Sequence, residues 1–282
     1  MRIAAVTDIH GNLPALEAVW AEIEREKPDL VVNLGDIAAG PLWPKETLQW
    51  LMAREKAEPR RWRTIAGNHE RQMLVPDIAR MGAADAYAAR AIGPDERAWL
   101  AALPKAMWIA PDVLLCHGTP ASDVGYFLQT VEPGWTRGGF PGVRRASPDE
   151  VRQRAAQLAD AREEPRRPGV GASLILCGHT HLPHMTKVPM GPLVVNGGSV
   201  GLQAYDDSHP LPHVAEAGSP HTRWALVERS NDGAWNVELR ATAYDWHVAA
   251  ARAESNGRGD WADAILTGFM GRFEAGGPVP GM

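Results

Sequence analysis

The sequence has few cysteines and no long apolar stretch. Two cysteines, Cys116 and Cys177, occur in 282 residues, each inside an apolar run. This argues against a disulfide scaffold, so we expect buried thiols in a reducing, cytoplasmic compartment. No apolar run approaches the roughly 20 residues of a membrane helix. The opening stretch MRIAAVTDIHGN meets an acid too early for a signal peptide.

Positive charge is also in short supply. The chain has 29 Lys and Arg against 34 Asp and Glu, a net charge of −5. This argues against a dedicated nucleic-acid-binding protein, which usually shows a basic face. A local basic groove is still compatible with this net charge. The composition, with 45% apolar and 22% charged residues, is typical of a globular protein. No membrane partner is predicted, and the oligomeric state is left open.

The first third of the chain alternates β-rich and helical patterns. Residues 2–8, 29–36 and 62–68 are short apolar runs typical of strands. Residues 13–26 carry apolar side chains three and four positions apart, and residues 45–56 also predict a helix. Strands that alternate with helices favour a parallel sheet with helices packed against it.

The whole pattern predicts a single large domain over residues 1–282 that carries two added segments. Residues 71–103 predict two or three short helices, and residues 119–171 an insertion with one helix at about 148–162, both as cap elements. The proline-rich stretch 205–221 is interpreted as a lid. Further strands are expected at 113–118, 174–177, 185–188 and 193–196, an antiparallel pair at 223–229 and 234–244, and helices at 247–254 and 261–273.

Polar side chains follow five of the predicted strands. The carboxyl ends of strands in open α/β sheets are where sites form, so we expect these side chains to meet. Residues two apart in extended chain share a face, which would let Asp8 with His10, and His179 with His181, point into one pocket. The candidate metal ligands are Asp8, His10, Asp36, Asn68, His117, His179 and His181, and His69 is the candidate catalytic residue.

This set is rich in imidazole and contains no thiolate. Seven groups exceed one tetrahedral site and suit two ions, and mixed nitrogen and oxygen ligands favour Mn, Fe, Zn, Co or Ni over Ca or Mg. Two divalent ions with Asp8, Asp36 and a bridging hydroxide would leave a charge near +1, which attracts a phosphate ester. Two such ions can activate water and hold phosphoryl oxygens for in-line attack.

The ordered motifs DIH, GD, GNHE, HG and GHTH resemble those of the calcineurin-like metallophosphoesterase superfamily, and within it the small bacterial phosphodiesterases. The resemblance extends to NGGSVG at residues 196–201 and AYDW at 243–246. It implies a four-layer α/β/β/α sandwich with two mixed sheets. It also implies a binuclear centre, with manganese first and iron, zinc, nickel or cobalt as alternatives.

The resemblance further implies a role for each motif residue. Asp8, His10 and His181 would bind one ion, Asn68, His117 and His179 the other, and Asp36 would bridge them. A metal-bridging hydroxide would attack phosphorus in a phosphodiester or small phosphomonoester. His69 would protonate the leaving oxygen, because imidazole titrates near working pH. Glu70 is expected to support or cap this segment.

One departure from the family pattern bears on His69. Protein phosphatases of the superfamily carry Asp-Arg-Gly after the bridging aspartate, whereas this chain reads GDIAAGP at residues 35–41. The acid that would orient His69 is therefore missing at that position, which weakens a protein-phosphatase interpretation. The alternatives are a nucleotide or diadenosine-polyphosphate hydrolase, a nuclease, or a non-catalytic metal-holding scaffold. Tyr126 and Phe127 are considered as pocket residues.

Overall fold

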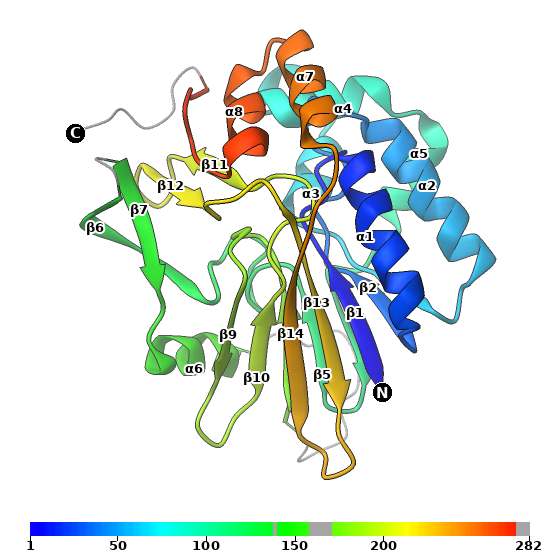
Figure 1. The fold of residues 1–282 in the computed structure, drawn as a ribbon, viewed down its shortest axis with the longest axis vertical. Helices are drawn as coiled ribbons and strands as arrows, with labels where there is room; N and C mark the ends of the chain where they lie inside the picture. Colours follow the sequence, from blue (N-terminus) through cyan, green and yellow to red (C-terminus); the bar gives the residue numbers. More distant parts are fainter. Residues whose placement is uncertain (138–139, 158–170, 275–282) are drawn as a thin grey trace.

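The protein is a sandwich of two β-sheets between helices, seen from one side in Figure 1. The structure, a computed structural model, describes residues 1–137, 140–157 and 171–274. Helices α1 (Leu13–Glu26), α2 (Pro44–Ala57) and α5 (Pro94–Ala101) lie beside one sheet, and α6 (Pro148–Ala156) lies on the other. The predicted four-layer α/β/β/α fold is confirmed.

The first sheet has five strands and contains the predicted parallel core. Strand β1 pairs in parallel with β2 and β2 with β3, while β13 pairs antiparallel with β1 and with β14. The β13–β14 hairpin is the predicted antiparallel pair. From edge to edge the strands are β14 (Trp235–Thr242), β13 (Thr222–Arg229), β1 (Arg2–Val6), β2 (Leu30–Asn33) and β3 (Trp62–Thr64).

The second sheet also has five strands and is mixed. Strand β8 lies between β5 and β10 and is parallel to both, so it is buried on both faces and reads as a continuous apolar run. The strands in order are β4 (Ala106–Ala110), β5 (Val113–Cys116), β8 (Leu174–Cys177), β10 (Leu193–Asn196) and β9 (His184–Lys187).

Alternate residues of the strands build separate layers of core. Ile3 of β1 and Leu176 of β8 belong to one apolar cluster between the two sheets. Val6 packs with the helices that cover the first sheet, and Cys177 packs with α6 outside the second. This period-two division fixes which face each strand presents. The carboxyl ends of β1 and β8 lie at the same edge of the sandwich, where His179 N–H donates to Asp8 Oδ2 at 3.1 Å.

Smaller elements gather at that edge, where Figure 1 shows β11, β12, α7 and α8 above the strand ends. Residues 205–221, interpreted as a lid loop, hold a hairpin of β11 (Ala204–Asp207) and β12 (His213–Glu216). It packs with α7 (Trp246–Ser255) and α8 (Gly259–Thr267). The insertion holds a second hairpin, β6 (Gln129–Arg137) with β7 (Phe140–Arg145).

The helical predictions hold with shifted ends. The segment 71–103 contains the second half of α3 (Asn68–Met73), a 3-10 turn at Ile78–Arg80, α4 (Ala83–Ala91) and α5. The helix expected at about 148–162 is described as α6 to Ala156, and its remainder lies outside the described residues. Among the described residues, none of the helices combines the length and hydropathy needed to cross a membrane.

Candidate metal centre

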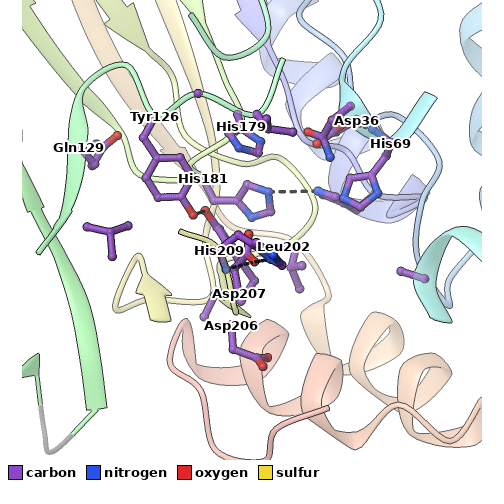
Figure 2. Close-up of a pocket in the computed structure, with 18 of the residues that line it drawn as sticks. Asp36, His69, Tyr126, Gln129, His179, His181, Leu202, Asp206, Asp207 and His209 are labelled. Atoms are coloured by element: carbon purple, nitrogen blue, oxygen red, sulfur yellow. Dashed lines mark hydrogen bonds and ion pairs between the residues drawn. The ribbon is translucent and has the colours of Figure 1, made fainter. Parts of the chain in front are cut away.

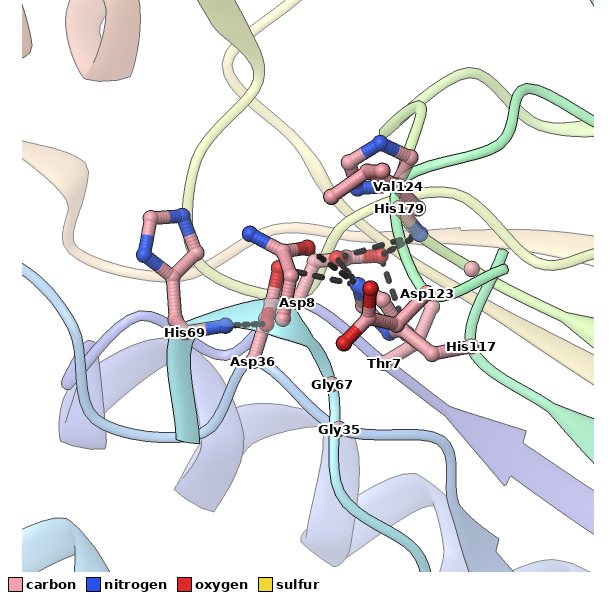
Figure 3. Close-up of polar contacts among 12 residues, drawn as sticks. Thr7, Asp8, Gly35, Asp36, Gly67, His69, His117, Asp123, Val124 and His179 are labelled. Atoms are coloured by element: carbon pink, nitrogen blue, oxygen red, sulfur yellow. Dashed lines mark hydrogen bonds and ion pairs between the residues drawn. The ribbon is translucent and has the colours of Figure 1, made fainter. Parts of the chain in front are cut away.

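The polar residues at the five strand ends do converge. Asp8 follows β1, Asp36 follows β2, Asn68 opens α3 just after β3, His117 follows β5, and two histidines follow β8. Figure 3 shows the side chains of Asp8, Asp36, His117 and His179 turned toward one another. Most are almost fully buried, although the sequence separates them by up to 173 residues, from Asp8 to His181.

The ligand atoms fall into two groups of three. Asp8, His10 and His181 form one group, with one ligand atom from each within 4.8 Å of the others. Asp36, His117 and His179 form the second group by the same measure. The groups adjoin, because His117 Nε2 lies 3.0 Å from Asp36 Oδ2 and 3.9 Å from Asp8 Oδ1.

Asn68 belongs with the second group. Its Oδ1 lies 3.1 Å from His117 Nε2, while its Nδ2 donates to Gln72 Oε1 one turn along α3 at 3.3 Å. The carboxamide is therefore turned so that its oxygen faces the centre. An oxygen is the amide atom that coordinates cations, so this orientation fits a ligand.

Backbone carbonyls set the direction of two of the imidazoles. His10 Nδ1 donates to the carbonyl of Ala39 at 2.8 Å, and His117 Nδ1 donates to that of Leu34 at 2.7 Å. In a neutral ring the other nitrogen, Nε2, then presents a lone pair to the centre. A histidine held by one nitrogen and free to coordinate by the other is the usual arrangement of a metal ligand.

The electrostatics also suit cations. Burial lowers the pKa of His10 to about 4 and that of His179 to about 3, so both rings are neutral at physiological pH, as coordination requires. Burial raises the pKa of Asp8 to about 7, with His117 opposing and Asp36 adding to the shift. Burial alone would lower the pKa of His117, but the Asp36 carboxylate raises it to about 9. Positive charge stabilises this group of residues, and the donor set fits divalent transition metals.

The backbone at these positions is not extended, which corrects the geometric reason given for the paired motifs. Asp8 has φ 54° and His10 φ 51°, and Asp36, His179 and His181 also have positive φ. Five of the seven non-glycine residues with positive φ in the described chain are thus candidate ligands. Left-handed turns, rather than a shared strand face, direct these side chains inward. They also send His179 and His181 to different groups.

Glycines beside the ligands permit close approach of the loops. A Cβ on Gly178 would lie 2.0 Å from Thr7 Oγ1 and 2.9 Å from Asp8 Oδ2. A Cβ on Gly67 would lie 2.2 Å from Asp36 Oδ1. The glycines that flank the motifs therefore let one ligand loop rest directly on another.

The motifs NGGSVG and AYDW hydrogen-bond to the loops that carry the candidate ligands. Ser199 Oγ donates to the Asp8 carbonyl at 2.8 Å, and Asn196 Nδ2 donates to the Gly178 carbonyl at 2.7 Å. Tyr244 accepts from Asn12 Nδ2, which also donates to the Gly201 carbonyl. NGGSVG and AYDW therefore position the loops that carry the candidate ligands.

His69 lies beside the centre and is held at two points. Its backbone N–H donates to Asp36 Oδ1 at 3.0 Å, and its ring Nδ1 lies 2.7 Å from Asp85 Oδ1 on α4. Burial alone would lower the pKa of His69, but the carboxylates of Asp36 and Asp85 outweigh it and raise the pKa to about 10. Glu70, expected to support this segment, accepts from the backbone N–H groups of Asp36, Ile37 and Gly67 at 2.7–2.9 Å.

A cavity of about 970 Å³ opens over the centre. Figure 2 shows His69, His179 and His181 on one side of it, with Tyr126 and the residues of the β11–β12 hairpin around them. Tyr126 lines the cavity, whereas Phe127 is buried in the core beside α6. Beyond the candidate ligands, the lining includes four carboxylates, those of Asp206, Asp207, Asp260 and Glu274, and two guanidiniums, those of Arg154 and Arg258.

Two tyrosines join the hairpin to the loop after β5. Tyr126 Oη lies 2.7 Å from both Tyr205 Oη and His213 Nε2. The Tyr126 ring also meets His179 edge-on at 5.3 Å, and Tyr205 meets His181 at 4.7 Å between ring centroids. Each histidine of the GHTH motif is thus packed against one tyrosine of the cavity.

Sequence reasoning did not find Asp85, Tyr205 or Asp206. Asp85 is a single acid in an alanine-rich helix, where a carboxylate in the first turn is explained by the helix dipole alone. The hairpin that carries Tyr205 and Asp206 lacks a clear alternating pattern. Only the folded structure shows that these three residues lie near the candidate ligands or the cavity.

Comparison with known proteins agrees with this geometry. A model of the calcineurin-like phosphoesterase family matches residues 1–183. A metallophosphoesterase from Sphaerobacter thermophilus is 22% identical with a TM-score of 0.65, covering 95% of this chain and 99% of its own. Hypothetical protein PH1004 from Pyrococcus horikoshii OT3 is 17% identical with a TM-score of 0.69, covering 96% and 99%. Both share the fold. No curated protein matches the chain.

Proposed function

Because the chain belongs to the calcineurin-like phosphoesterase family and is therefore a metal-dependent phosphoesterase, we propose that it is a two-metal hydrolase of small phosphodiesters or phosphomonoesters. The observation that carries this proposal is the pair of adjoining ligand groups. Asp8, His10 and His181 would hold one ion. Asn68, His117 and His179 would hold the other, with Asp36 between them.

The ions would activate a water molecule and neutralise phosphoryl oxygens in an in-line displacement. The chain's own residues do the rest. The backbone carbonyls of Ala39 and Leu34 keep two imidazoles turned toward the centre. His69 stands beside the centre on the cavity wall, where it donates a proton to the departing oxygen. We expect manganese first among the candidate ions, and a cytoplasmic setting.

The charge of the cavity favours a small ester over a polyphosphate or a nucleic acid. Beyond the candidate ligands, four carboxylates and two guanidiniums, those of Arg154 and Arg258, line the cavity. The guanidinium of Arg258 is already paired, at 2.6 Å with Asp260 and at 3.0 Å with Glu274. Carboxylates still outnumber guanidiniums in this part of the lining, which opposes further phosphate groups that reach past the centre. A single phosphate with an uncharged or cationic alcohol part suits the cavity better.

The test combines elemental analysis with a substrate panel. Purified protein is analysed for bound metals and then assayed with added Mn, Ni, Fe or Zn. The panel holds matched mono- and diesters, a diadenosine polyphosphate and single-stranded DNA. We expect about two ions per chain and turnover of the small esters. A single ion at saturation would overturn the two-metal proposal, and preference for the polyphosphate or DNA would overturn the substrate class.

A further inference from the structure

The contact between His69 and Asp85 brings a buried acid to the edge of the metal centre. His69 Nδ1 and Asp85 Oδ1 are 2.7 Å apart. The Asp85 side chain is 6% exposed and the His69 side chain 26%. Asp85 stands in the first turn of α4, whose sequence AADAYAARA is mostly alanine. A carboxylate buried in such a helix needs a partner, because burying a charge alone is costly.

The backbone of His69 is already fixed without Asp85. Its N–H donates to Asp36 Oδ1, and Glu70 ties the same turn to the loop after β2 through three backbone N–H groups. The ring, however, can still turn about its two side-chain torsions, and about a quarter of it faces open space. The ring meets the His10 ring edge-on at 5.4 Å between centroids, and the contact with Asp85 is the side-chain hydrogen bond that fixes its orientation.

The contact also decides which ring nitrogen is left to face a substrate. An ionised carboxylate only accepts hydrogen bonds, so Nδ1 must be the donor. Nε2 is then the nitrogen that remains for a substrate in the cavity, which His69 lines. A ring whose Nδ1 is engaged by an acid delivers a proton from Nε2 along a fixed direction, as a catalytic histidine requires.

We propose that Asp85 is the positioning residue of His69, taking the place of the acid that this chain lacks after Asp36. The proposal rests on the proposed function, since it assigns Asp85 to the step in which the leaving oxygen is protonated. The acid comes from α4, in the helical segment that follows GNHE, and not from the loop after β2. Asp85 touches no substrate and acts through His69.

The test compares two leaving groups in Asp85→Ala, Asp85→Asn and wild-type enzyme loaded with manganese. An alkyl phosphate ester needs a proton on its leaving oxygen, whereas a nitrophenyl ester does not. We expect Asp85→Ala to lower kcat about 10- to 100-fold on the alkyl ester, with little change on the nitrophenyl ester and in KM. Asp85→Asn should recover part of the loss, because its carboxamide oxygen still accepts from Nδ1.

A double variant separates positioning from folding. If Asp85 acts through His69, then Asp85→Ala should cost nothing further on the alkyl ester in a His69→Asn background. Asp95→Ala, an exposed acid in the first turn of α5, is the matched control and should behave as wild type. Metal content and thermal midpoint are measured for every variant.

Two results would overturn the proposal: an equal loss of kcat on both esters, or an additive loss in the double variant. These outcomes differ from a failure of the proposed function. In that case, the metal-loaded wild-type enzyme would hydrolyse neither ester, and the Asp85 variants would have no activity to compare.

Discussion

His10 Nε2 lies 3.1 Å from His181 Nε2, and burial lowers the pKa of both rings so that neither is charged at neutral pH. The single proton of neutral His10 sits on Nδ1, which donates to the carbonyl of Ala39. Its Nε2 therefore presents a lone pair to another imidazole nitrogen. Asp8 Oδ1 is also 3.6 Å from His181 Nε2. Donor atoms gathered in this way are stabilised by a cation between them.

Replacing the carboxylate between the two ligand groups should disrupt both. We expect Asp36→Asn to abolish detectable turnover and to lower the metal content to one ion or none. An amide is neutral, so it attracts two cations less than a carboxylate does. It also has only one oxygen, which cannot both accept from the His69 N–H and coordinate two ions. Elemental analysis with a phosphatase assay is the measurement. Unchanged metal stoichiometry and turnover would contradict the bridging role.

Removing the imidazole of His69 should separate catalysis from metal binding. We expect His69→Asn to keep both ions and to lose about 100-fold or more in rate on an alkyl ester, with a smaller loss on a nitrophenyl ester. His247→Asn, an exposed histidine on α7, serves as control. Steady-state kinetics on both esters measures these losses. Wild-type rates on the alkyl ester would exclude the acid role.

A cavity carboxylate should make stability depend on pH. Burial, then Glu274 and Asp260, raise the pKa of Asp206 from 3.8 to about 6. The unfolded chain ionises this group at lower pH than the folded one, so its contribution to stability is lost as pH rises from about 4 to about 6. Asp206→Asn should therefore leave the thermal midpoint unchanged near pH 4 and raise it by about 2 °C above pH 6, partial exposure reducing the effect.

Thermal scans at several pH values measure this difference. Asp149→Asn, which removes an exposed charge on α6, controls for the loss of a carboxylate in general. A midpoint difference for Asp206→Asn that is independent of pH would show that desolvation of this group does not destabilise the fold.

Much of the fold could be predicted because the chain's patterns are local. The parallel order of β1, β2 and β3 follows from alternating apolar runs and helical stripes, and the β13–β14 hairpin follows from its turn residues. Within each sheet, the ends of the parallel strands could be predicted to meet at one edge. That the two sheets bring these edges together follows from the sandwich that the family resemblance implied. The motifs therefore indicate from sequence alone where these side chains gather, and the role of each residue stays a prediction.

Other parts could not be predicted, since they depend on contacts between distant residues. The partner of His69 lies on α4, and nothing in AADAYAARA distinguishes Asp85 from a carboxylate that favours a helix N-terminus. The hairpin over residues 204–216 has proline, histidine and acids where alternation would have shown strands. The left-handed backbone at Asp8 and His10 could not be predicted, because glycine is the usual residue in this conformation and other residues adopt it only occasionally.

Adding a single methyl group should test how closely the ligand loops rest on each other. In Gly178→Ala the new Cβ would clash with Thr7 Oγ1, and we expect a loss of about 1–3 kcal/mol in the free energy of unfolding. Displacement of Asp8 should also weaken metal binding. Gly171→Ala, where a Cβ meets nothing within 4 Å, is the control. Denaturant titration and metal analysis measure both effects, and equal stability of the two variants would contradict the close approach.

The left-handed turns at Asp8, His10, Asp36, His179 and His181 have a consequence for evolution and for engineering. Each costs about 1–2 kcal/mol in a residue with a side chain, so together they are comparable with the net stability of a whole domain. Glycine at any of them would relax the chain while deleting a donor atom. If stability alone were selected, we would expect glycine to replace these residues. Retention of aspartate and histidine would then indicate selection for activity.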